Sequence, residues 1–586
     1  MHFLSQVQPD ASFVGQGFCA LAQEKEFMSS LNATSRNWVI QSINKALPML
    51  STWESIDVSY SNMYFMGMVN AIICGEAPGV DSTLGAASAR HGYALLNRWL
   101  EYAAVAGNHE FDSPTYYWVQ FNALGLGCMY SLDVTRRAQL CGVLEHLWAD
   151  VASNWFASTE TLSGPHSRDY DFLYGHGALQ VLTYINGLGE HAPVCEFHDA
   201  HCERTNDGQN ALVLLNALRA RDGSGKGHQP SAGTLSLSNI SVRLVQSRWL
   251  GQNLTANNMT GRFGDRYNYI KSGVYAMGSA SQDYITNTHF PFAPYYPCPQ
   301  DKLISIDLAV NDMTQYRPAP SITLVHDWLD HPWGHNWGSN PTNKPSHLAP
   351  HPGNVQHKNI LLSTSALNPS EKLDGFNITN FQNLATNVIL PASPHSTFYY
   401  VNGDDNVTAP PDDVYRRQLD LLSTIGVRVG SSCLAVRVLA GDGLEGFIPS
   451  LEIKADQVGL GLGAFRLALY HYVGKANQLS SSSHVANAFL MVVQECSSDG
   501  SGGRGAGLIE LVKEIAGVVI NQHRDNNVWL LSAVVRGTTL EVVRDVSVPH
   551  CSSWECVMTR RVNGTDVVPV PLTLNGQIVV PLPTPL

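Results

Sequence analysis

The sequence predicts an α+β multidomain protein in which a helical N-terminal part is followed by a large antiparallel β-sandwich region. Apolar residues recur at helical spacing in the first part of the chain and alternate with polar residues in the rest. A glycine-rich stretch from Asp222 to Pro230 separates the two patterns. With 586 residues, the chain is long enough for several domains. We expect domains at 1–225, 226–450 and 451–586.

Helical periodicity dominates the first domain. In its first expected helix, Val39, Ile43 and Leu47 fall on one side. Ser113 and Pro114 form a helix-start signature, because serine caps free N–H groups and proline fits the first helical position. The expected helices cover 35–50, 62–74, 83–106, 114–130, 134–157, 177–187 and 207–220.

Strand periodicity begins at residue 234. Residues 234–245 alternate between apolar and polar, which predicts a half-buried strand. Asn575-Gly576 predicts a two-residue hairpin turn near the C-terminus, and one helix is expected at 508–515. The further expected strands cover 303–310, 322–326, 360–363, 387–390, 397–401, 433–439, 465–472, 488–495, 528–535, 539–543, 567–574 and 577–582.

Composition excludes several partners. The net charge is −13, and the lysines and arginines are scattered without a dense run. Nucleic-acid-binding proteins usually show a basic patch, so no nucleic-acid partner is expected. No uninterrupted apolar stretch reaches about 18 residues, so no membrane span is expected either. The oligomeric state stays open.

The compartment is predicted from composition. The N-terminus lacks a positive region followed by an apolar one, so no signal peptide is expected in this chain. Few lysines and many Asn, Ser and Thr residues favour a secreted or extracellular glycoprotein. The 11 cysteines include the close pairs Cys195/Cys202 and Cys551/Cys556, for which disulfide loops and buried free thiols are both open. The N-x-S/T sequons are at Asn32, Asn239, Asn253, Asn258, Asn377, Asn406 and Asn563.

Two segments between expected helices concentrate chemically versatile side chains. In the first, Asn108, His109 and Glu110 precede a helix start, close to free backbone donors and the positive end of the helix dipole. A structural role is the alternative, with Asp112 and Ser113 as caps. Connecting segments on a helical scaffold are a common place for catalysis.

The second segment follows the expected helix at 134–157. Here Arg168 could bind a carboxylate bidentately, and His166 and Tyr170 could exchange protons. The alternative is a structural ion pair between Arg168 and Asp169 or Asp171.

β-Elimination on a uronic-acid polysaccharide uses these residue types together. The carboxylate at C5 must be neutralised to acidify the C5 proton, which amide, imidazole or guanidinium groups can do. A Tyr or His takes that proton, and a Tyr can return one to the leaving glycosidic oxygen. The predicted catalytic residues are Asn108, His109, His166, Arg168 and Tyr170. Carboxylate-only polymers such as alginate or glucuronan are favoured over sulfated glycans, because the chain holds few spare cations.

A family resemblance supports this prediction. The segments 110–116 and 164–170 resemble motifs of heparinase II/III-like proteins, and the overall organisation resembles the chondroitin AC-type polysaccharide lyases as well. The resemblance implies an incomplete (α/α) toroid that carries the cleft, with β-sandwiches that close over it. Toroid-type alginate lyases use an Asn-His pair, then an Arg and a Tyr. Asn108-His109, Arg168 and Tyr170 or Tyr174 follow a similar order.

Substrate contacts are expected from aromatic residues near both segments and from the first β strands. For Tyr269, packing within a strand is the alternative to facing the cleft. The predicted substrate-binding residues are Glu110, Tyr116, Tyr117, Tyr174 and Tyr269.

No cofactor and no catalytic metal are expected. The spacing of His331 and His335 is interrupted by residues that oppose a helix, so a zincin site is not predicted. A structural divalent metal could bind at His326, Asp327 and His335, as in some heparinase II-like relatives. Stacking of a sugar on nearby tryptophans is the alternative.

Two other functions stay open. A glycoside hydrolase on a similar toroid would use two carboxylates, Glu110 or Asp112 with Asp169 or Asp171. A non-catalytic glycan-binding protein would keep the aromatic residues but would not need Arg168. Absorbance of an unsaturated uronate product distinguishes a lyase from both.

Overall fold

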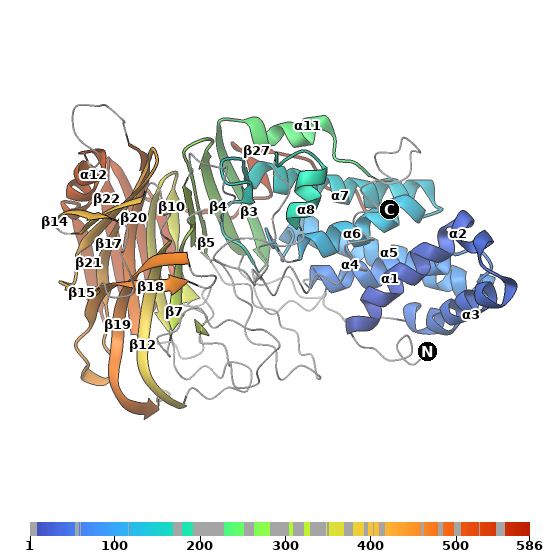
Figure 1. Ribbon diagram of the computed structural model, residues 1–586, viewed down its shortest axis with the longest axis horizontal. Coiled ribbons are helices and arrows are strands. Elements are labelled where there is room, and N and C mark those ends of the chain that lie inside the picture. The colour runs from blue at the N-terminus through green and yellow to red at the C-terminus, as the bar shows by residue number, and fades with distance from the viewer. Residues whose placement is uncertain are drawn as a thin grey trace.

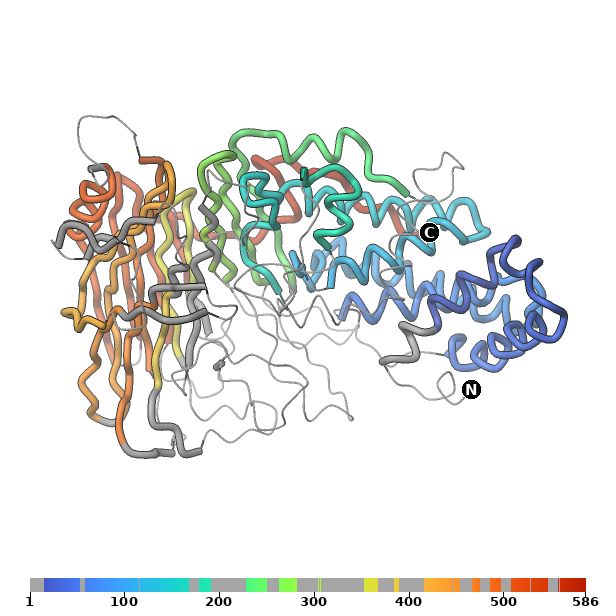
Figure 2. The backbone as a smooth tube through the Cα atoms, viewed as in Figure 1, coloured from blue at the N-terminus to red at the C-terminus, as the bar shows by residue number. Residues whose placement is uncertain are grey.

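A computed structural model gives the architecture, in which helices at one end adjoin stacked antiparallel sheets at the other (Figure 1). The tube in Figure 2 follows the chain from the helical end into the sheets and back, so that the C-terminus lies beside the helices. The described residues are 9–52, 58, 60–114, 116–167, 179–190, 228–250, 263–281, 304–308, 321–327, 347–348, 351–367, 379–391, 397–401, 404–408, 416–458, 462–478, 485–496, 506–526, 528–545 and 557–586.

The helical part is built around two buried helices. All residues of α4 are buried and almost all of α6, as expected for helices that are apolar on every side. The helices α1, α5 and α6 pack against α4. In order, the helices are α1 (Pro9–Gln23), α2 (Lys25–Ser30), α3 (Ala33–Leu50), α4 (Ser61–Gly75), α5 (Ser82–Ala106), α6 (Tyr117–Tyr130), α7 (Val134–Asn154) and α8 (Leu179–Ile185). The toroid stays a prediction.

Side-chain caps define several helix starts. Asn32, Asp81 and Asp133 each accept hydrogen bonds from free backbone N–H groups at the starts of α3, α5 and α7. The predicted start of α6 is three residues too early. Ser113 accepts a hydrogen bond from the N–H of Tyr116 at 3.0 Å and so closes a separate turn ahead of the helix.

One large antiparallel sheet begins at the helical part. Its twelve strands include β8 (His347–Leu348), which pairs with β7. The other strands, in spatial order, are β15 (Arg416–Leu419), β18 (Ser450–Val458), β19 (Leu462–Gln478), β12 (Thr379–Pro391), β7 (Ser321–Asp327), β6 (Ile304–Leu308), β5 (Tyr275–Ala280), β4 (Phe263–Lys271), β3 (Val242–Leu250), β26 (Thr573–Leu574) and β27 (Gln577–Ile578). The predicted division at residue 450 falls at the start of β18.

Two further sheets stack beside it. The eight-stranded sheet contains β10 (Val355–His357), β11 (Ile360–Leu367), β20 (Val485–Glu495), β17 (Ser432–Gly441), β16 (Thr424–Val429), β13 (Thr397–Val401) and β14 (Asp404–Thr408), with β9 (His351–Pro352) beside β11. The five-stranded sheet contains β21 (Ile520–Asp525), β22 (Val528–Val535), β23 (Thr538–Asp545), β24 (Val557–Val562) and β25 (Thr565–Asp566). The expected helix at 508–515 is α12 (Ala506–Ala516), which packs on β16 and β17.

Two apolar cores hold these sheets together. Met277 and Leu467 of the large sheet share one core with Met491 of the eight-stranded sheet. On the other side of the eight-stranded sheet, Leu490 shares a second core with Leu531 of the five-stranded sheet and with α12. The antiparallel sandwich expected from the alternating pattern is confirmed in this layered form.

The strand predicted at 234–245 is wrong over its first eight residues. Residues 232–235 form α11 (Ala232–Leu235) and are followed by a 3-10 turn, η2 (Ser236–Asn239). The strand β3 begins only at Val242. Serine hydroxyls bond to nearby carbonyls here, as in Ser236 to Gly233 at 2.7 Å, and this local bonding competes with a strand.

The predicted C-terminal hairpin forms, whereas one predicted helix is shorter than expected. Asn575 and Gly576, both with positive φ, join β26 and β27 in the hairpin that their sequence predicts. The helix predicted at 134–157 ends early, because Trp155–Phe156 forms β1 and pairs with β2 (Thr161–Leu162). The helix predicted at 207–220 lies outside the described residues.

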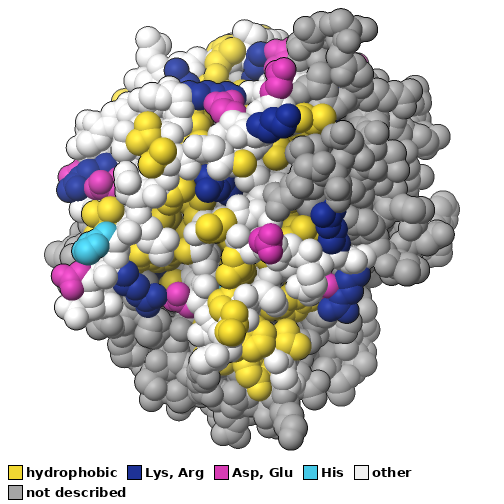
Figure 3. Space-filling model, turned by 90° about the vertical axis from the view of Figure 1, so that its left-hand side faces the viewer, with side chains coloured by type: hydrophobic (Ala, Val, Ile, Leu, Met, Phe, Trp, Pro, Cys, Tyr) yellow, Lys and Arg dark blue, Asp and Glu magenta, His cyan; other side chains and the backbone are white. Residues whose placement is uncertain are grey.

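The surface of the β end carries charges of both signs. Figure 3 shows Lys and Arg side chains interspersed with Asp and Glu among apolar ones. The described residues of this face therefore form no large field of a single sign. In the helices that the structure describes, none has both the length and the apolar character needed to cross a membrane.

Candidate functional site

The candidate site lies at the junction of the helical part and the large sheet. A loop connects α5 to α6, and a second segment follows β2. Gly107 starts the loop at the C-terminus of α5 with φ of 70°, which favours glycine. A Cβ atom there would lie 2.2 Å from the carbonyl oxygen of Arg248 in β3, so the loop is pressed directly against the sheet.

The two segments contact each other through their backbones. The carbonyl oxygen of Phe111 accepts hydrogen bonds from the N–H of Ser167 at 3.1 Å and from its hydroxyl group at 2.8 Å. The two segments therefore meet at Phe111 and Ser167, whereas the convergence of the predicted catalytic side chains on one cleft, which the lyase hypothesis requires, stays a prediction.

Glu110 is tied to the start of α4. Its carboxylate accepts hydrogen bonds at 2.7 Å from both the backbone N–H and the side-chain amide of Asn62. Gln120 of α6 donates a third bond at 3.2 Å. Since the side chain is fully buried, Glu110 holds two helices together and neutralises a helix N-terminus.

Asn108 is the residue of this loop that combines partial exposure with a fixed orientation. Its amide oxygen accepts a hydrogen bond from the Ser61 hydroxyl at 2.9 Å, and its amide nitrogen donates to Gln120 at 3.1 Å. The neighbouring His109 is almost fully buried.

A buried ionic cluster lies behind the loop. Arg266 of β4 forms ion pairs with Asp112 and with Asp150 of α7, the latter at 2.5 Å. Tyr117 donates a hydrogen bond to Asp150 at 2.8 Å, and the guanidinium carbon of Arg266 lies 5.8 Å from the centroid of the Phe111 ring. The cluster thus joins the loop, two helices and the sheet.

Burial sets the protonation of this cluster. It raises the pKa of Asp112 well above its usual value, although Arg266 lowers it, and the charge of Asp150 raises it further. Burial also raises the pKa of the Tyr117 phenol, with Asp150 adding to the shift. The pKa of Arg266 is raised by the two carboxylates, despite the opposing effect of burial. The guanidinium therefore keeps its charge between the two carboxyl groups.

Asn268 lies on β4, the strand that also carries Arg266, and connects the second segment to that strand. It donates hydrogen bonds to Asn154 of α7 at 2.9 Å and to the Ser163 hydroxyl at 3.1 Å. Gly164 follows with φ of 97°, and a Cβ atom there would lie 2.8 Å from the Asn268 amide nitrogen. Glycine is therefore required for this close approach.

His166 is fully buried at this junction. Its Nε2 atom lies 3.0 Å from the carbonyl oxygen of Leu162 and donates to it. The predicted catalytic residues Asn108, His109 and His166 thus lie in the two segments that meet. His109 and His166 are buried, so of these three only Asn108 has the exposure needed to reach a substrate in this structure. Arg168, Tyr170 and Tyr174 lie outside the described residues.

The predicted aromatic residues have different surroundings. Tyr116 is partly exposed at the start of α6. Tyr117 is buried in the ionic cluster. Successive side chains of a strand point to opposite faces, so Tyr269 lies on the face of β4 opposite to Arg266 and Asn268. It packs near Tyr275, with ring centroids 6.3 Å apart, and is not part of the junction.

Several residues of the junction were not predicted. Asp150 and Asn154 are four residues apart on α7 and therefore share one face. Arg266 and Asn268 are two residues apart on β4 and share one of its faces, because alternate side chains of a strand point to the same side. Both spacings are visible in the sequence. The contacts of Arg266 with Asp150 and of Asn268 with Asn154 are not.

The predicted structural metal site is not tested. His326 and Asp327 end strand β7, but their side chains lie outside the described residues. His335 lies outside them as well.

One family model and two solved structures match this chain. A family model described as a domain of unknown function, DUF8769, matches residues 10–208. Two solved structures of heparinase III, one with methylated lysines, match at 11% identity each. Both comparisons cover 87% of this chain and 69% of the other, with TM-scores of 0.29 and 0.27. No curated protein matches. TM-scores this low carry no argument about fold or activity.

Proposed function

We propose that this chain is a polysaccharide lyase that cleaves a uronic-acid-containing polysaccharide by β-elimination. The observation that supports this most directly is the double hydrogen bond between Ser167 and Phe111. It joins the loop that carries Asn108 and His109 to the segment that leads, in sequence, into Arg168 and Tyr170.

The chemistry of the junction fits this reaction. A lyase must stabilise charge that develops on the substrate carboxylate, and fixed donors do so without reorganisation. Asn108 has such a fixed amide, held by Ser61 and Gln120. Arg168 would neutralise the carboxylate, and Tyr170 would take the C5 proton and return one to the leaving oxygen.

The glycoside hydrolase alternative is less favoured. Its carboxylates would have to reach the substrate, but Glu110 is fully buried against Asn62. Asp112 is fully buried against Arg266. Such partners suit a structural role better than acid–base chemistry on a sugar.

We further propose a secreted enzyme and a substrate that carries carboxylates without sulfates. The described residues contain three disulfides, Cys19–Cys74, Cys128–Cys141 and Cys433–Cys496, which form and persist in oxidising compartments. The net charge of −13 disfavours heavily sulfated polymers. Alginate and glucuronan are the preferred substrates.

The test is incubation of the full chain with alginate, glucuronan, heparin and chondroitin, with ultraviolet absorbance reporting the unsaturated uronate. Absorbance should rise with a carboxylate-only polymer and be lost in Tyr170→Phe and Arg168→Ala. Tyr184→Phe is the matched control, because Tyr184 on α8 is 40% exposed and lies outside the junction.

The other outcomes favour the other functions. New reducing ends without absorbance would indicate hydrolysis. Retention on the polymers without any product would indicate a glycan-binding protein. Either result would overturn the lyase proposal.

A further inference from the structure

The end of the chain runs in an extended form along the helical part. After β27, residues 580–586 return to the helices, and Figure 2 shows the C-terminus beside them. This segment, which we call the strap, has proline at positions 581, 583 and 585. Proline lacks a backbone N–H and presets an extended backbone, so alternating prolines oppose both a helix and a sheet ladder. The strap is therefore held by contacts with other parts of the chain.

Two side chains of α7 bind the backbone of the strap. Nδ1 of His146 donates a hydrogen bond to the carbonyl oxygen of Val580 at 2.5 Å. The amide nitrogen of Gln139 donates to the carbonyl oxygen of Thr584 at 2.6 Å. The two donors are separated by about two turns of the helix, so they lie on the same face of α7. This face therefore follows the strap along most of its length.

Asn97 of α5 binds the end of the strap. Its amide nitrogen donates to a backbone oxygen of Leu586, and its amide oxygen accepts from the N–H of Leu586 at 3.1 Å. Arg136 donates to the amide oxygens of Asn97 at 2.6 Å and of Gln139 at 3.1 Å. Because Arg136 holds both amide oxygens, both amide nitrogens are oriented toward the strap. Such fixed donors reduce the entropy that is lost when a peptide binds.

The side chains of the strap are matched by a notch and an apolar contact. Gly142 lies between Gln139 and His146 on α7, and a Cβ atom there would lie 2.7 Å from Cγ of Pro583. The three atoms nearest to that Cβ position all belong to Pro583. Glycine inside a helix is destabilising relative to alanine, so the contact with Pro583 gives this glycine a reason. Beside it, Leu582 packs against the apolar core of the helical part.

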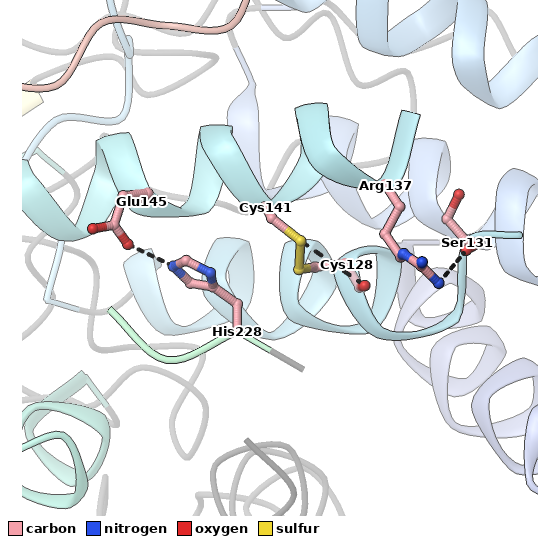
Figure 4. Close-up of a disulfide and its surroundings, with 6 residues drawn as sticks. All are labelled: Cys128, Ser131, Arg137, Cys141, Glu145 and His228. Atoms are coloured by element: carbon pink, nitrogen blue, oxygen red, sulfur yellow. Dashed lines mark hydrogen bonds and ion pairs between the residues drawn. A yellow bond between two sulfur atoms is a disulfide. The ribbon is translucent and has the colours of Figure 1, made fainter. Parts of the chain in front are cut away.

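The helix that carries the notch is also fixed by contacts outside the strap. Figure 4 shows the disulfide between Cys128 of α6 and Cys141 of α7, whose Cα atoms lie 5.0 Å apart. Cys141 directly precedes Gly142. On the next turn of α7, Glu145 accepts a hydrogen bond from His228 at 2.7 Å. The groove on α7 should therefore keep its shape when the strap leaves it.

We propose that Asn97, Gln139, Gly142 and His146 form a binding site for an extended peptide with alternating prolines. The strap occupies this site as a tethered ligand and latches α7 to the large sheet. Side-chain donors bind the backbone oxygens of the peptide, as in other sites that recognise proline-rich segments. The notch and the apolar contact select a proline and a leucine.

The latch follows from the path of the chain. The strap comes after β27, which pairs with β26, and β26 pairs with β3 of the large sheet. At the junction, Asp150 and Asn154 of the same helix bond to Arg266 and Asn268 of the neighbouring strand β4. The strap is thus a second attachment of α7 to the sheet, and its release should loosen the junction.

A fluorescently labelled peptide with the sequence of residues 579–586 tests the site on the full chain. A tethered strap has an effective concentration on the order of millimolar, so micromolar peptide should not bind the unaltered chain. Leu582→Asp in the chain removes the apolar anchor, and the released site should then bind the peptide, with a rise in fluorescence anisotropy. A peptide that carries the same Leu582→Asp change is the control and should not bind.

Further substitutions in the Leu582→Asp chain locate the bound peptide. Gln139→Ala should weaken binding by about 5-fold or more, because it removes one hydrogen bond. Gly142→Leu should abolish binding, because its side chain fills the notch. Arg137→Ala is the matched control on α7, since the guanidinium of Arg137 donates to the Ser131 carbonyl and not to the strap. It should leave the affinity unchanged.

Hydrogen exchange tests the latch. In the Leu582→Asp chain, the backbone N–H of Ser167, which bonds to Phe111 at the junction, should exchange faster than in the unaltered chain. Exchange in α12, which packs on β16 and β17, should not change. Circular dichroism verifies that each variant is folded, and Leu582→Ala carries both tests if Leu582→Asp does not fold.

Three results would overturn the proposal. The first is a folded, strap-released chain that does not bind the peptide, or that binds it no better than the unaltered chain does. The second is binding that survives Gly142→Leu. The third is unchanged exchange of the Ser167 N–H after release of the strap, which would show that the strap is not a latch.

Discussion

The carbonyl oxygen of Phe111 accepts two hydrogen bonds from Ser167, one from its N–H and one from its hydroxyl group. These residues are 56 positions apart in the sequence, and both are buried. The contact fixes the loop before α6 against the segment after β2, and Arg266 and Asn268 of β4 close the junction from the sheet side. The position of the proposed catalytic groups therefore depends on this junction.

Ser167→Ala removes the hydroxyl bond and keeps the backbone bond. We expect a loss of about 1 kcal/mol in the free energy of unfolding, because a typical hydrogen bond contributes about that much. Urea unfolding measures the loss. Ser238→Ala is the control, since its hydroxyl donates a similar bond to the Leu235 carbonyl at 2.7 Å. If lyase activity is detected, only Ser167→Ala should lower it; equal effects of both variants would contradict the positioning role.

Gly164→Ala tests the close approach of the second segment to the sheet. Its φ of 97° and the short distance to Asn268 both oppose a Cβ atom. Gly187→Ala is the control, because Gly187 has φ of 83° but no neighbour within 4 Å of a Cβ atom. Backbone strain alone costs about 1–2 kcal/mol. We expect thermal unfolding to show a clearly larger loss for Gly164→Ala, and equal losses would contradict the tight contact.

Arg266→Met should be strongly destabilising, by about 3–5 kcal/mol, because it leaves the buried Asp112 and Asp150 without their cation. Adding Asp112→Asn and Asp150→Asn should recover part of this loss. Arg536→Met is the control, since its ion pair with Glu514 is exposed and exposed pairs contribute little. Denaturant unfolding compares these variants. A small effect of Arg266→Met would show that the cluster does not hold the junction.

The buried His471 should make stability depend on pH. Burial lowers the pKa of His471 to about 4, although Asp442 has the opposing effect. A histidine in the unfolded chain has a pKa of about 6.5. The unfolded chain therefore binds a proton in this window that the folded chain does not. Stability should fall as the pH falls from about 6.5 to 4, by up to about 3 kcal/mol.

Unfolding free energies measured across this pH range test that expectation. His471→Gln should flatten the dependence, because it removes the titrating group that bonds to Thr386. The control is His523→Gln, since His523 is exposed on β21. An unchanged slope in His471→Gln would refute the assignment.

Local signals in the sequence predicted some elements correctly and others wrongly. The Asn575-Gly576 turn needs only two residues with positive φ, and the hairpin forms as expected. The alternating pattern of residues 234–245 failed over its first eight residues, because serine hydroxyls bond to nearby backbone carbonyls there. The spacing of apolar residues alone could not show that residues 234–239 form helical turns and not a strand.

The junction depends on contacts between distant parts of the chain. Arg266 pairs with Asp112, 154 positions away, and nothing in the local pattern of either residue specifies the other. Glu110 and Tyr117 were expected to bind substrate, and their burial instead places them in structural contacts with Asn62 and Asp150. Polarity marked two segments that the fold brings into contact, but burial, which the sequence does not give, decides which side chains can meet a substrate.

The central claim is β-elimination, and the fate of solvent oxygen tests it most directly. A lyase adds no water across the bond that it cleaves, whereas a hydrolase adds one water molecule for each cleavage. Digestion of alginate or glucuronan by the full chain in water enriched in heavy oxygen, followed by mass spectrometry of the products, separates the two. We predict unsaturated uronates without heavy oxygen at the cleaved bond. Saturated products that carry heavy oxygen would contradict the account.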